Sequence, residues 1–304
     1  MADEDHDRPN PHRRGLRKGL YLIPSVFTAA NIGMGFFSVM ASLRGFQILG
    51  SANPDTAAAA SHFDSAAVAI GWALLFDMLD GRIARLTRTT TEIGIQLDSI
   101  ADVVTFGIAP AVLAYVWGYG ASLTEGSDLH RLAWFLSFMY LMCGAFRLAR
   151  FNVQASRPRI IAEGTPKVDK KNFVGLPIPV AGGLIAALVH FSPAPLTYFG
   201  PERARIYSGL LMVLVGLLSL MMVSTLRFSS FKTVGTRVRS MRTIILALAV
   251  GMLIFLYSQY VLLAIVVTYI LHGLIARVAA VFWRRGESAE AKIEPNPVGR
   301  SSGS

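Results

Sequence analysis

About eight long apolar stretches, separated by short polar segments, follow one another along the chain. Each is roughly 20 residues long, the length that an α-helix needs to cross about 30 Å of hydrocarbon. The last two share an apolar run of roughly 40 residues, too long for one crossing, which we divide at Ser258 and Gln259. The pattern predicts an all-α, polytopic membrane helix bundle of about eight transmembrane helices. The predicted spans lie near residues 21–43, 64–85, 95–118, 132–151, 174–193, 206–226, 242–258 and 260–282.

The composition agrees with a membrane bundle. Of the 304 residues, 53% are hydrophobic and 16% are charged, whereas an ordinary soluble domain has about 25% charged residues. Residues 1–18 and 286–304 are polar, and we expect both to be disordered cytosolic tails. The single cysteine, Cys143, excludes a disulfide within one chain, and the histidines lack the spacing of metal ligands.

The basic residues lie almost entirely on one side of the predicted bundle. With an even number of spans both termini share a side, and every Lys and Arg lies on that side except Arg44, Arg131, Arg203 and Arg205. Short loops rich in Lys and Arg remain cytosolic. We therefore expect a multi-pass protein of the inner (cytoplasmic) membrane with both termini in the cytosol. The net charge of +10 follows from this bias and indicates no nucleic-acid partner.

Four aspartates lie in the cytosolic halves of the second and third predicted spans: Asp77, Asp80, Asp98 and Asp102. A carboxylate at the centre of a spanning helix costs roughly 2.5–3.5 kcal/mol, so four uncompensated carboxylates would cost on the order of 10 kcal/mol. Positive charge must therefore be present where they lie.

The spacing of these aspartates predicts two facing pairs. Positions three and four apart share a helix face, so each span presents its two aspartates on one stripe. In an antiparallel hairpin with its turn at residues 88–91, Asp77 would face Asp102, because the two are equally far from the turn. For the same reason Asp80 would face Asp98.

Converging carboxylates repel one another unless cations bind between them, and all-oxygen ligands select hard metals such as Mg²⁺ or Mn²⁺, with Ca²⁺ as a further occupant. Two such ions about 3.5–4 Å apart stabilise the attacking and leaving oxygens of a phosphoryl displacement. The small residues Gly81, Ala84 and Gly94 leave room for a phosphate or nucleotide against the backbone. Arg85 could reach phosphate oxygens with two N–H groups.

Two other interpretations fit parts of this pattern. The carboxylates could pair with Arg82 or Arg85 and join the helices. As a remote alternative, they could carry ions in a cation-coupled transporter. Transport needs a path to the external face, which aspartates confined to the cytosolic halves of their spans do not supply.

The residues from Asp77 to Asp102 complete the motif D-x-x-D-G-x-x-A-R-x(8)-G-x-x-x-D-x-x-x-D without departure at any fixed position. In this the chain resembles the CDP-alcohol phosphotransferase family. The resemblance covers mainly residues 20–226, so we assign residues 19–228 to a six-helix membrane core and residues 229–285 to an additional transmembrane helix pair. Within the family, residues 147–152 and 175–179 resemble bacterial integral-membrane phosphatidylserine synthases.

The resemblance implies an enzyme that transfers the phosphatidyl group of CDP-diacylglycerol to the hydroxyl of L-serine and releases CMP. It implies that Asp77, Asp80 and Asp98 hold two divalent cations and that Asp102 is both a ligand and the general base. The aspartates would serve any acceptor, so choline, inositol phosphate and glycerol phosphate stay open as alternatives. A homodimer is implied by the family alone.

The resemblance also implies contacts around the reacting phosphate. In the first span, Thr28 and Asn31 match the family's P-x-x-x-T-x-x-N pattern, although a hydrogen bond between helices explains them equally well. Arg147 and Arg150 would recognise the phosphate or the serine carboxylate, or else extend to the headgroups. Ser99 would shape the acceptor site. The residues expected to contact CDP are Gly81, Ala84, Arg85, Gly94, Thr28 and Asn31.

Overall fold

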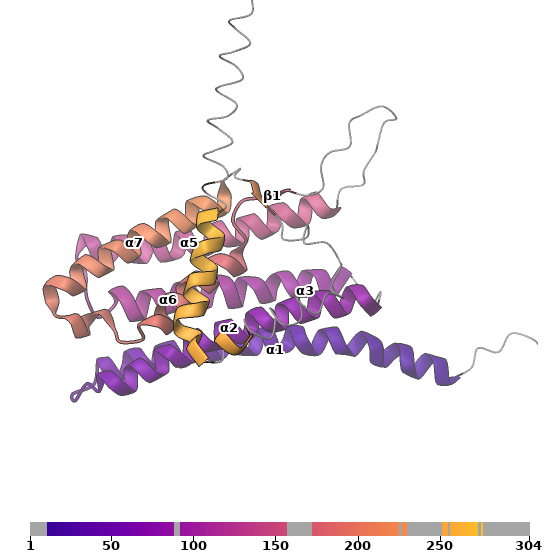
Figure 1. Ribbon diagram of the computed structural model, residues 1–304, viewed down its shortest axis with the longest axis horizontal. Coiled ribbons are helices and arrows are strands. Elements are labelled where there is room, and N and C mark those ends of the chain that lie inside the picture. Colours follow the sequence, from indigo (N-terminus) through magenta and orange to yellow (C-terminus); the bar gives the residue numbers. More distant parts are fainter. Residues whose placement is uncertain are drawn as a thin grey trace, which may run out of the picture.

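The computed structural model describes residues 11–87, 92–156, 172–224, 227–229, 251–254, 256–272 and 275. These residues form a bundle of helices (Figure 1). A helix without a label in Figure 1, drawn in gold, spans Leu256–His272. The prediction of a helical bundle is confirmed for the described residues. The labelled α-helices are α1 (Pro11–Leu49), α2 (Thr56–Thr87), α3 (Glu92–Asp102), α4 (Ala109–Ala114), α5 (Asp128–Ser156), α6 (Ile178–Phe191) and α7 (Pro201–Val223).

Four described helical segments are long and apolar enough to cross a membrane: Val26–Leu49, Glu92–Tyr119, Asp128–Val153 and Pro201–Val223. Two further apolar helices, α6 and Leu256–His272, are shorter. The outer surface is apolar as well, since Leu210, Val213 and Leu220 of α7 are each more than half exposed. A soluble protein rarely exposes such a stripe, whereas hydrocarbon chains would cover it. The structure therefore supports a membrane protein, and the number of about eight spans stays a prediction.

Small residues bring the helices close together. α1 and α2 lie side by side in Figure 1, with α2 against α6 and α5 against α7. A Cβ atom at Gly35 of α1 would stand 2.4 Å from Thr105 Oγ1, and one at Gly45 would stand 2.8 Å from the Phe63 ring. Only glycine permits these approaches, which are typical of helix packing in membranes.

The predicted span at residues 95–118 is one continuous helical segment with two wider turns. After α3 the chain passes through the π-helical η1 (Val103–Ile108), α4 and the π-helical η2 (Tyr115–Tyr119). The Thr105 hydroxyl donates a hydrogen bond of 3.1 Å to the Asn31 carbonyl, and the Tyr140 hydroxyl donates one of 3.0 Å to the Phe106 carbonyl. These bonds join η1 to α1 and α5. η1 begins directly after Asp102, and π turns are frequent at functional sites.

A short antiparallel ribbon, which the apolar pattern does not predict, joins two distant segments. β1 (Asn172–Val174) pairs with β2 (Arg227–Ser229). α6 therefore begins at Ile178, and not near residue 174 as predicted. The delay has a local cause: Gly175 has a φ of +83°, and Pro177, which precedes the helix, has extended backbone angles. α7 likewise ends at Val223 instead of residue 226.

Two further predicted boundaries are wrong. Residues 11–18, expected in a disordered tail, belong to α1, because basic residues and leucine are good helix formers that continue the first apolar span. The break at Ser258 and Gln259 is also wrong, since residues 256–272 form one helix. Ser258 needs no loop because its hydroxyl has a partner on α6, His190. The remaining parts of the predicted tails, the turn at 88–91 and most of residues 229–250 lie outside the described residues.

Candidate active site

Three of the predicted aspartates converge. Asp77 of α2 and Asp98 and Asp102 of α3 each offer a carboxylate oxygen, and these oxygens all lie within 4.8 Å of one another. Asp98 and Asp102 share a face of α3 because they are four residues apart. Asp77 and Asp98 are partly buried, while Asp102 is 9% exposed. We call these three residues the acidic triad.

The carboxylates interact in the pairs that the hairpin predicts. The charge of Asp77 acts on Asp102, and the charge of Asp80 acts on Asp98. Asp98 also acts on Asp102, its neighbour on the same helix. Because like charges this close repel one another, the folded chain carries an electrostatic cost that a cation between the carboxylates would remove.

The acidic triad fits a divalent cation in donor type and spacing. Oxygens bound to one ion at 2.0–2.6 Å stand at most about 5 Å apart, and those of the triad meet this limit. In the described part of the chain, the buried Asp102 Oδ1 has no hydrogen-bond partner. Leaving such an oxygen unpaired is costly, and a bound cation would satisfy it. The triad could therefore hold a hard metal ion.

Asp80 is held by the first helix. Asp80 is 6% exposed, and its carboxylate accepts a hydrogen bond from the Thr28 hydroxyl of α1. Thr28 thus makes the bond between helices that the sequence analysis left open, and it makes it to a residue of the predicted metal site. A bond of this kind orients a carboxylate that binds a metal.

Asn31 lies one turn further along α1 and is 1% exposed. Both polar atoms of its side chain are buried and, among the described residues, lack a hydrogen-bond partner. A side-chain amide whose oxygen and nitrogen both lack a partner there is better suited to binding a polar ligand than to a contact between helices. The predicted nucleotide-side role therefore has more support for Asn31 than for Thr28.

The small residues of the motif differ in their positions. Gly81 is half-buried on α2, and Gly94 is exposed near the start of α3. Ala84 and Arg85 belong to α2, but their side chains lie outside what the structure describes. The predicted phosphate contacts of Arg85 consequently stay a prediction.

Of the two arginines on α5, the structure brings Arg147 to the aspartates. Its charge interacts with Asp102, and its Nε is buried without a hydrogen-bond partner in the described ranges. Arg150 is exposed, which fits the alternative of extension to the headgroups. Among the described side chains, Arg147 thus brings one positive charge to Asp102, which is less than the negative charge of the acidic triad and agrees with a cation site.

Ser99 and Asn152 form a contact that the sequence did not predict. The Asn152 amide at the end of α5 donates a hydrogen bond of 2.8 Å to the Ser99 hydroxyl on α3. Asn152 belongs to the segment 147–152, whose resemblance to phosphatidylserine synthases is the sequence signal that could have identified it.

Comparison with known proteins gives a consistent result. A family model described as CDP-alcohol phosphatidyltransferase matches residues 21–198. A CDP-diacylglycerol–serine O-phosphatidyltransferase from Helicobacter pylori strain J99 is 30% identical over 256 residues, which is 84% of this chain and 91% of the relative. The enzyme of the same name from Saccharomyces cerevisiae is 33% identical over 59% of this chain and 57% of its own length. An archaetidylserine synthase from Methanothermobacter thermautotrophicus is 27% identical over 70% of this chain and 72% of its own length.

Proposed function

This chain belongs to the CDP-alcohol phosphatidyltransferase family, and we propose that it transfers the phosphatidyl group of CDP-diacylglycerol to the hydroxyl of L-serine. The products are phosphatidylserine and CMP. Serine is the acceptor named for the H. pylori and yeast relatives. The archaeal relative bears the name of a serine-containing lipid as well.

One observation carries the proposal: the acidic triad of Asp77, Asp98 and Asp102 lies inside the segment that the family model matches. Three carboxylate oxygens within 4.8 Å of one another could hold a divalent cation, and phosphoryl transfer is chemistry that such cations accelerate. We propose that Asp77, Asp80, Asp98 and Asp102 hold two ions, Mg²⁺ or Mn²⁺. The bound ions would neutralise negative charge on the phosphates.

The chain's own residues would then organise the displacement. The serine oxygen forms a bond to the lipid-side phosphorus while the bond from that phosphorus to the CMP oxygen breaks. Asp102 accepts the serine proton, and the electron pair of the broken bond leaves on CMP. Burial of Asp102 supports this role, because a partly desolvated carboxylate is a better base than one in water.

The nucleotide would lie against α1 and α2. Asn31 offers an amide with both ends unpaired in the described part of the chain, and Gly81 and Gly94 present backbone without side chains. Thr28 would act through Asp80, which it hydrogen-bonds. Ala84 and Arg85 complete this side of the proposal on the strength of the motif.

The acceptor would bind between α3 and α5. Arg147 would pair with the serine carboxylate, since guanidinium and carboxylate match in geometry and charge, and it is the α5 arginine whose charge interacts with Asp102. Ser99, hydrogen-bonded to Asn152, would shape the same side. For Arg150 we propose contact with lipid headgroups, because it is exposed.

We place the reaction at the cytosolic face of the inner membrane. The distribution of basic residues supports cytosolic termini, and the apolar exterior of α7 supports acyl chains that remain in the bilayer. About eight spans and a homodimer belong to the same proposal.

The test is release of CMP by the purified protein. CDP-diacylglycerol and Mg²⁺ or Mn²⁺ are supplied with serine, choline, inositol phosphate or glycerol phosphate in turn. We expect release with serine, and its loss in Asp102→Asn by roughly two to four orders of magnitude, the usual effect of removing a general base. Asp128→Asn, an exposed aspartate at the start of α5, is the matched control.

Release with another alcohol but not with serine would overturn the acceptor while retaining the chemistry. If no combination of acceptor and metal gives CMP release, the proposed enzymatic activity is wrong, and the cation-coupled transporter becomes the better explanation of the aspartates. Full activity of Asp102→Asn would exclude Asp102 as the base.

A further inference from the structure

A small surface pocket lies at the end of the bundle opposite to the acidic triad. Its volume is about 230 Å³, and it is lined by Tyr115, His130, Arg131 and Trp134. Tyr115 belongs to η2, at the end of its span, and the others belong to the first two turns of α5. Arg147 follows Arg131 by sixteen residues on α5, which is roughly 24 Å along the helix axis. Most of the thickness of a hydrocarbon core, about 30 Å, therefore separates this pocket from the candidate active site.

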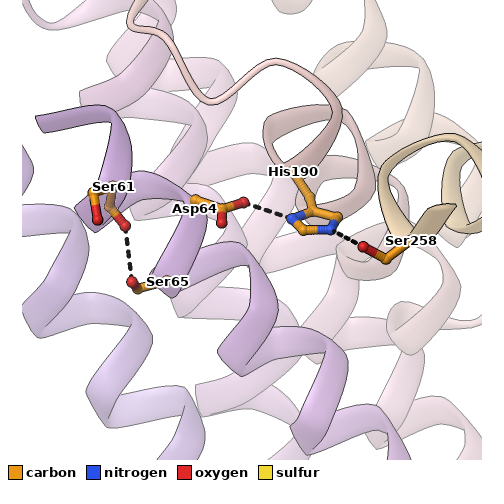
Figure 2. Close-up of polar contacts among 5 residues, drawn as sticks. All are labelled: Ser61, Asp64, Ser65, His190 and Ser258. Carbon is orange, nitrogen blue, oxygen red and sulfur yellow. Dashed lines mark hydrogen bonds and ion pairs between the residues drawn. The ribbon is translucent and has the colours of Figure 1, made fainter. Parts of the chain in front are cut away.

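A second polar cluster lies at the same end of the bundle, where the Trp117 Nε1–H of η2 donates a hydrogen bond of 2.9 Å to the Ala194 carbonyl. In this cluster His190 Nδ1 lies 2.5 Å from Asp64 Oδ1, and His190 Nε2 lies 2.9 Å from Ser258 Oγ (Figure 2). The His190 side chain is 12% exposed, and both of its ring nitrogens have a partner. The cluster therefore joins three helices and has the character of a structural contact.

The hydrogen bonds of His130 leave a donor free in the pocket. The Gly126 N–H, which can only donate, donates to His130 Nδ1 at 3.3 Å. Nδ1 is therefore an acceptor, and the neutral ring carries its hydrogen on Nε2. Nε2 lies 2.6 Å from the Tyr115 hydroxyl oxygen, so the ring donates to that oxygen. The hydrogen of the Tyr115 hydroxyl then has no acceptor among the described residues and is available to a ligand.

Arg131 brings a second set of donors to the pocket. Its Nη1 lies 3.5 Å from Asp128 Oδ1, and the two side chains are 75% and 100% exposed. An ion pair so exposed contributes little, and it engages only part of a guanidinium that has five N–H donors. The guanidinium and the Tyr115 hydroxyl thus offer hydrogen bonds from two sides of the pocket, and phosphate oxygens accept hydrogen bonds of this kind.

An aromatic surface continues from the pocket along α5. Trp134 and Phe138 are stacked, with ring centroids 5.8 Å apart and planes at 8° to each other. Phe135 lies beside them, and all three side chains are exposed. They follow Arg131 by three, four and seven residues and so share its face of the helix. Tryptophan is typical of the boundary between headgroups and hydrocarbon. The donors therefore lie at the level of headgroups, and the rings extend toward the level of acyl chains.

The charges near the pocket select among lipid headgroups. Between residues 120 and 134 the charged side chains are Glu125, Asp128 and Arg131, two negative and one positive. Glu125 directly precedes Gly126, whose N–H contacts the His130 ring. A headgroup with a net negative charge would meet this excess negative charge, whereas an ammonium group beyond the phosphate would be attracted to Glu125.

We propose that this pocket binds a phospholipid from the leaflet opposite to the acidic triad, and that the headgroup of this lipid carries an ammonium group beyond its phosphate. The phosphate accepts hydrogen bonds from the Tyr115 hydroxyl and the Arg131 guanidinium, and the ammonium group faces Glu125. An acyl chain lies along Trp134 and Phe138. The inference goes beyond the proposed function and does not depend on it, because these residues are distant from the acidic triad.

The test is native mass spectrometry of the purified full-length protein in detergent, titrated with phosphatidylethanolamine in the absence of CDP-diacylglycerol and serine. We expect Tyr115→Phe and Arg131→Gln each to raise the Kd about tenfold, the effect of losing a hydrogen bond to a charged group. Tyr198→Phe and Arg203→Gln change exposed residues near the same end of the bundle. They are the matched controls and should bind the lipid like the wild type.

Tyr115→Phe retains the aromatic ring, so we expect the lipid-free variant to unfold at the wild-type Tm, which separates lost binding from lost folding. Phosphatidylglycerol, which has a net negative charge, tests the choice of headgroup. The wild type should bind it about fivefold more weakly than phosphatidylethanolamine, and Glu125→Gln should reduce this difference to less than about twofold.

Two results would overturn the proposal. If Tyr115→Phe and Arg131→Gln both bind phosphatidylethanolamine as tightly as the wild type, the pocket does not hold a lipid phosphate. If the wild type binds phosphatidylglycerol more tightly than phosphatidylethanolamine, the ammonium-bearing headgroup is wrong.

Discussion

The Asn152 side chain donates a hydrogen bond of 2.8 Å to the Ser99 hydroxyl, and Ser99 in turn donates one of 3.0 Å to the Ile95 carbonyl. The bond joins the end of α5 to α3 one residue after Asp98. The sequence linked Ser99 and the segment 147–152 to the acceptor on separate grounds, and this hydrogen bond joins the two. The amide also fixes the orientation of α3 relative to Arg147, which lies on the same helix as Asn152.

We expect Asn152→Ala and Ser99→Ala each to raise the KM for serine about fivefold, because each removes the hydrogen bond between the two side chains, worth about 1 kcal/mol. Ser99→Ala also removes the bond to the Ile95 carbonyl, which lies within α3 and does not join the two helices. The double variant should be no worse than the stronger single variant, since both remove the same bond. Steady-state CMP release with varied serine measures the effect. Val153→Ala, an exposed neighbour on α5, serves as control. If the double variant instead raises the KM for serine by the product of the two single effects, the two residues act separately.

The acidic triad should bind metal before any substrate is present. We expect a chelator to abolish CMP release and added Mg²⁺ or Mn²⁺ to restore it. Direct titration of the protein with Mn²⁺, followed by the paramagnetic resonance of the free ion, should give a Kd at least about tenfold weaker in Asp98→Asn than in the wild type. Asp128→Asn should bind like the wild type. Equal Mn²⁺ binding in Asp98→Asn would remove Asp98 from the metal site.

The pairing of the aspartates could be predicted because it depends on two regular quantities. Helix periodicity places residues three and four apart on one face. In a helical hairpin, two residues that are equally far from the turn in the sequence lie at the same depth in the bundle. Asp77 with Asp102, and Asp80 with Asp98, follow from these alone, and both pairs interact in the structure.

The contacts that the sequence does not predict join residues far apart in the chain. Asp64 and His190 are separated by 126 positions, and Thr28 and Asp80 by 52. No periodicity relates such positions, because they depend on how whole helices pack. The π turns after Asp102 and the β1–β2 ribbon could not be predicted for a related reason. A run of apolar residues indicates burial, but it does not indicate which backbone groups form hydrogen bonds with each other.

One sequence feature acquires a different meaning. Residues 175–179 favoured serine as acceptor, yet Gly175 packs against the end of α7, where the Leu176 N–H donates to the Met221 carbonyl at 3.0 Å. That segment therefore has a structural reason for its glycine. The evidence for serine consequently depends more on Arg147, Ser99 and Asn152.

The Thr28 hydroxyl should matter through Asp80. We expect Thr28→Val, which retains the shape of the side chain, to weaken Mn²⁺ binding roughly tenfold or more, the usual effect of losing a partner of a metal-binding carboxylate. Thr28→Ser should retain most of the affinity because it retains the donor. Ser42→Ala is the control on the same helix, since the Ser42 hydroxyl donates to the Ser38 carbonyl within α1, at 2.7 Å. If Thr28→Val lowers nucleotide affinity but leaves Mn²⁺ binding intact, Thr28 contacts the nucleotide directly.

Gly175→Ala should destabilise the bundle. Gly175 has a φ of +83°, a conformation that costs an L-residue roughly 1–2 kcal/mol, and its added Cβ would stand 2.3 Å from the Met222 carbonyl oxygen. We expect a loss of about 5 °C in Tm, given the usual relation between free energy and Tm for a chain of this size. A maleimide dye can report the transition, because the single cysteine, Cys143, is buried and reacts only when the bundle opens.

Gly183→Ala is the matched control for Gly175→Ala. Gly183 lies on α6 within helical backbone, and a Cβ there would meet no atom within 4 Å. Alanine is favoured over glycine in a helix by up to about 1 kcal/mol, so this variant should unfold at the wild-type temperature or slightly above it. If Gly175→Ala unfolds at the same temperature as Gly183→Ala, the turn before α6 tolerates a side chain. The close contact with α7 is then not what requires glycine there.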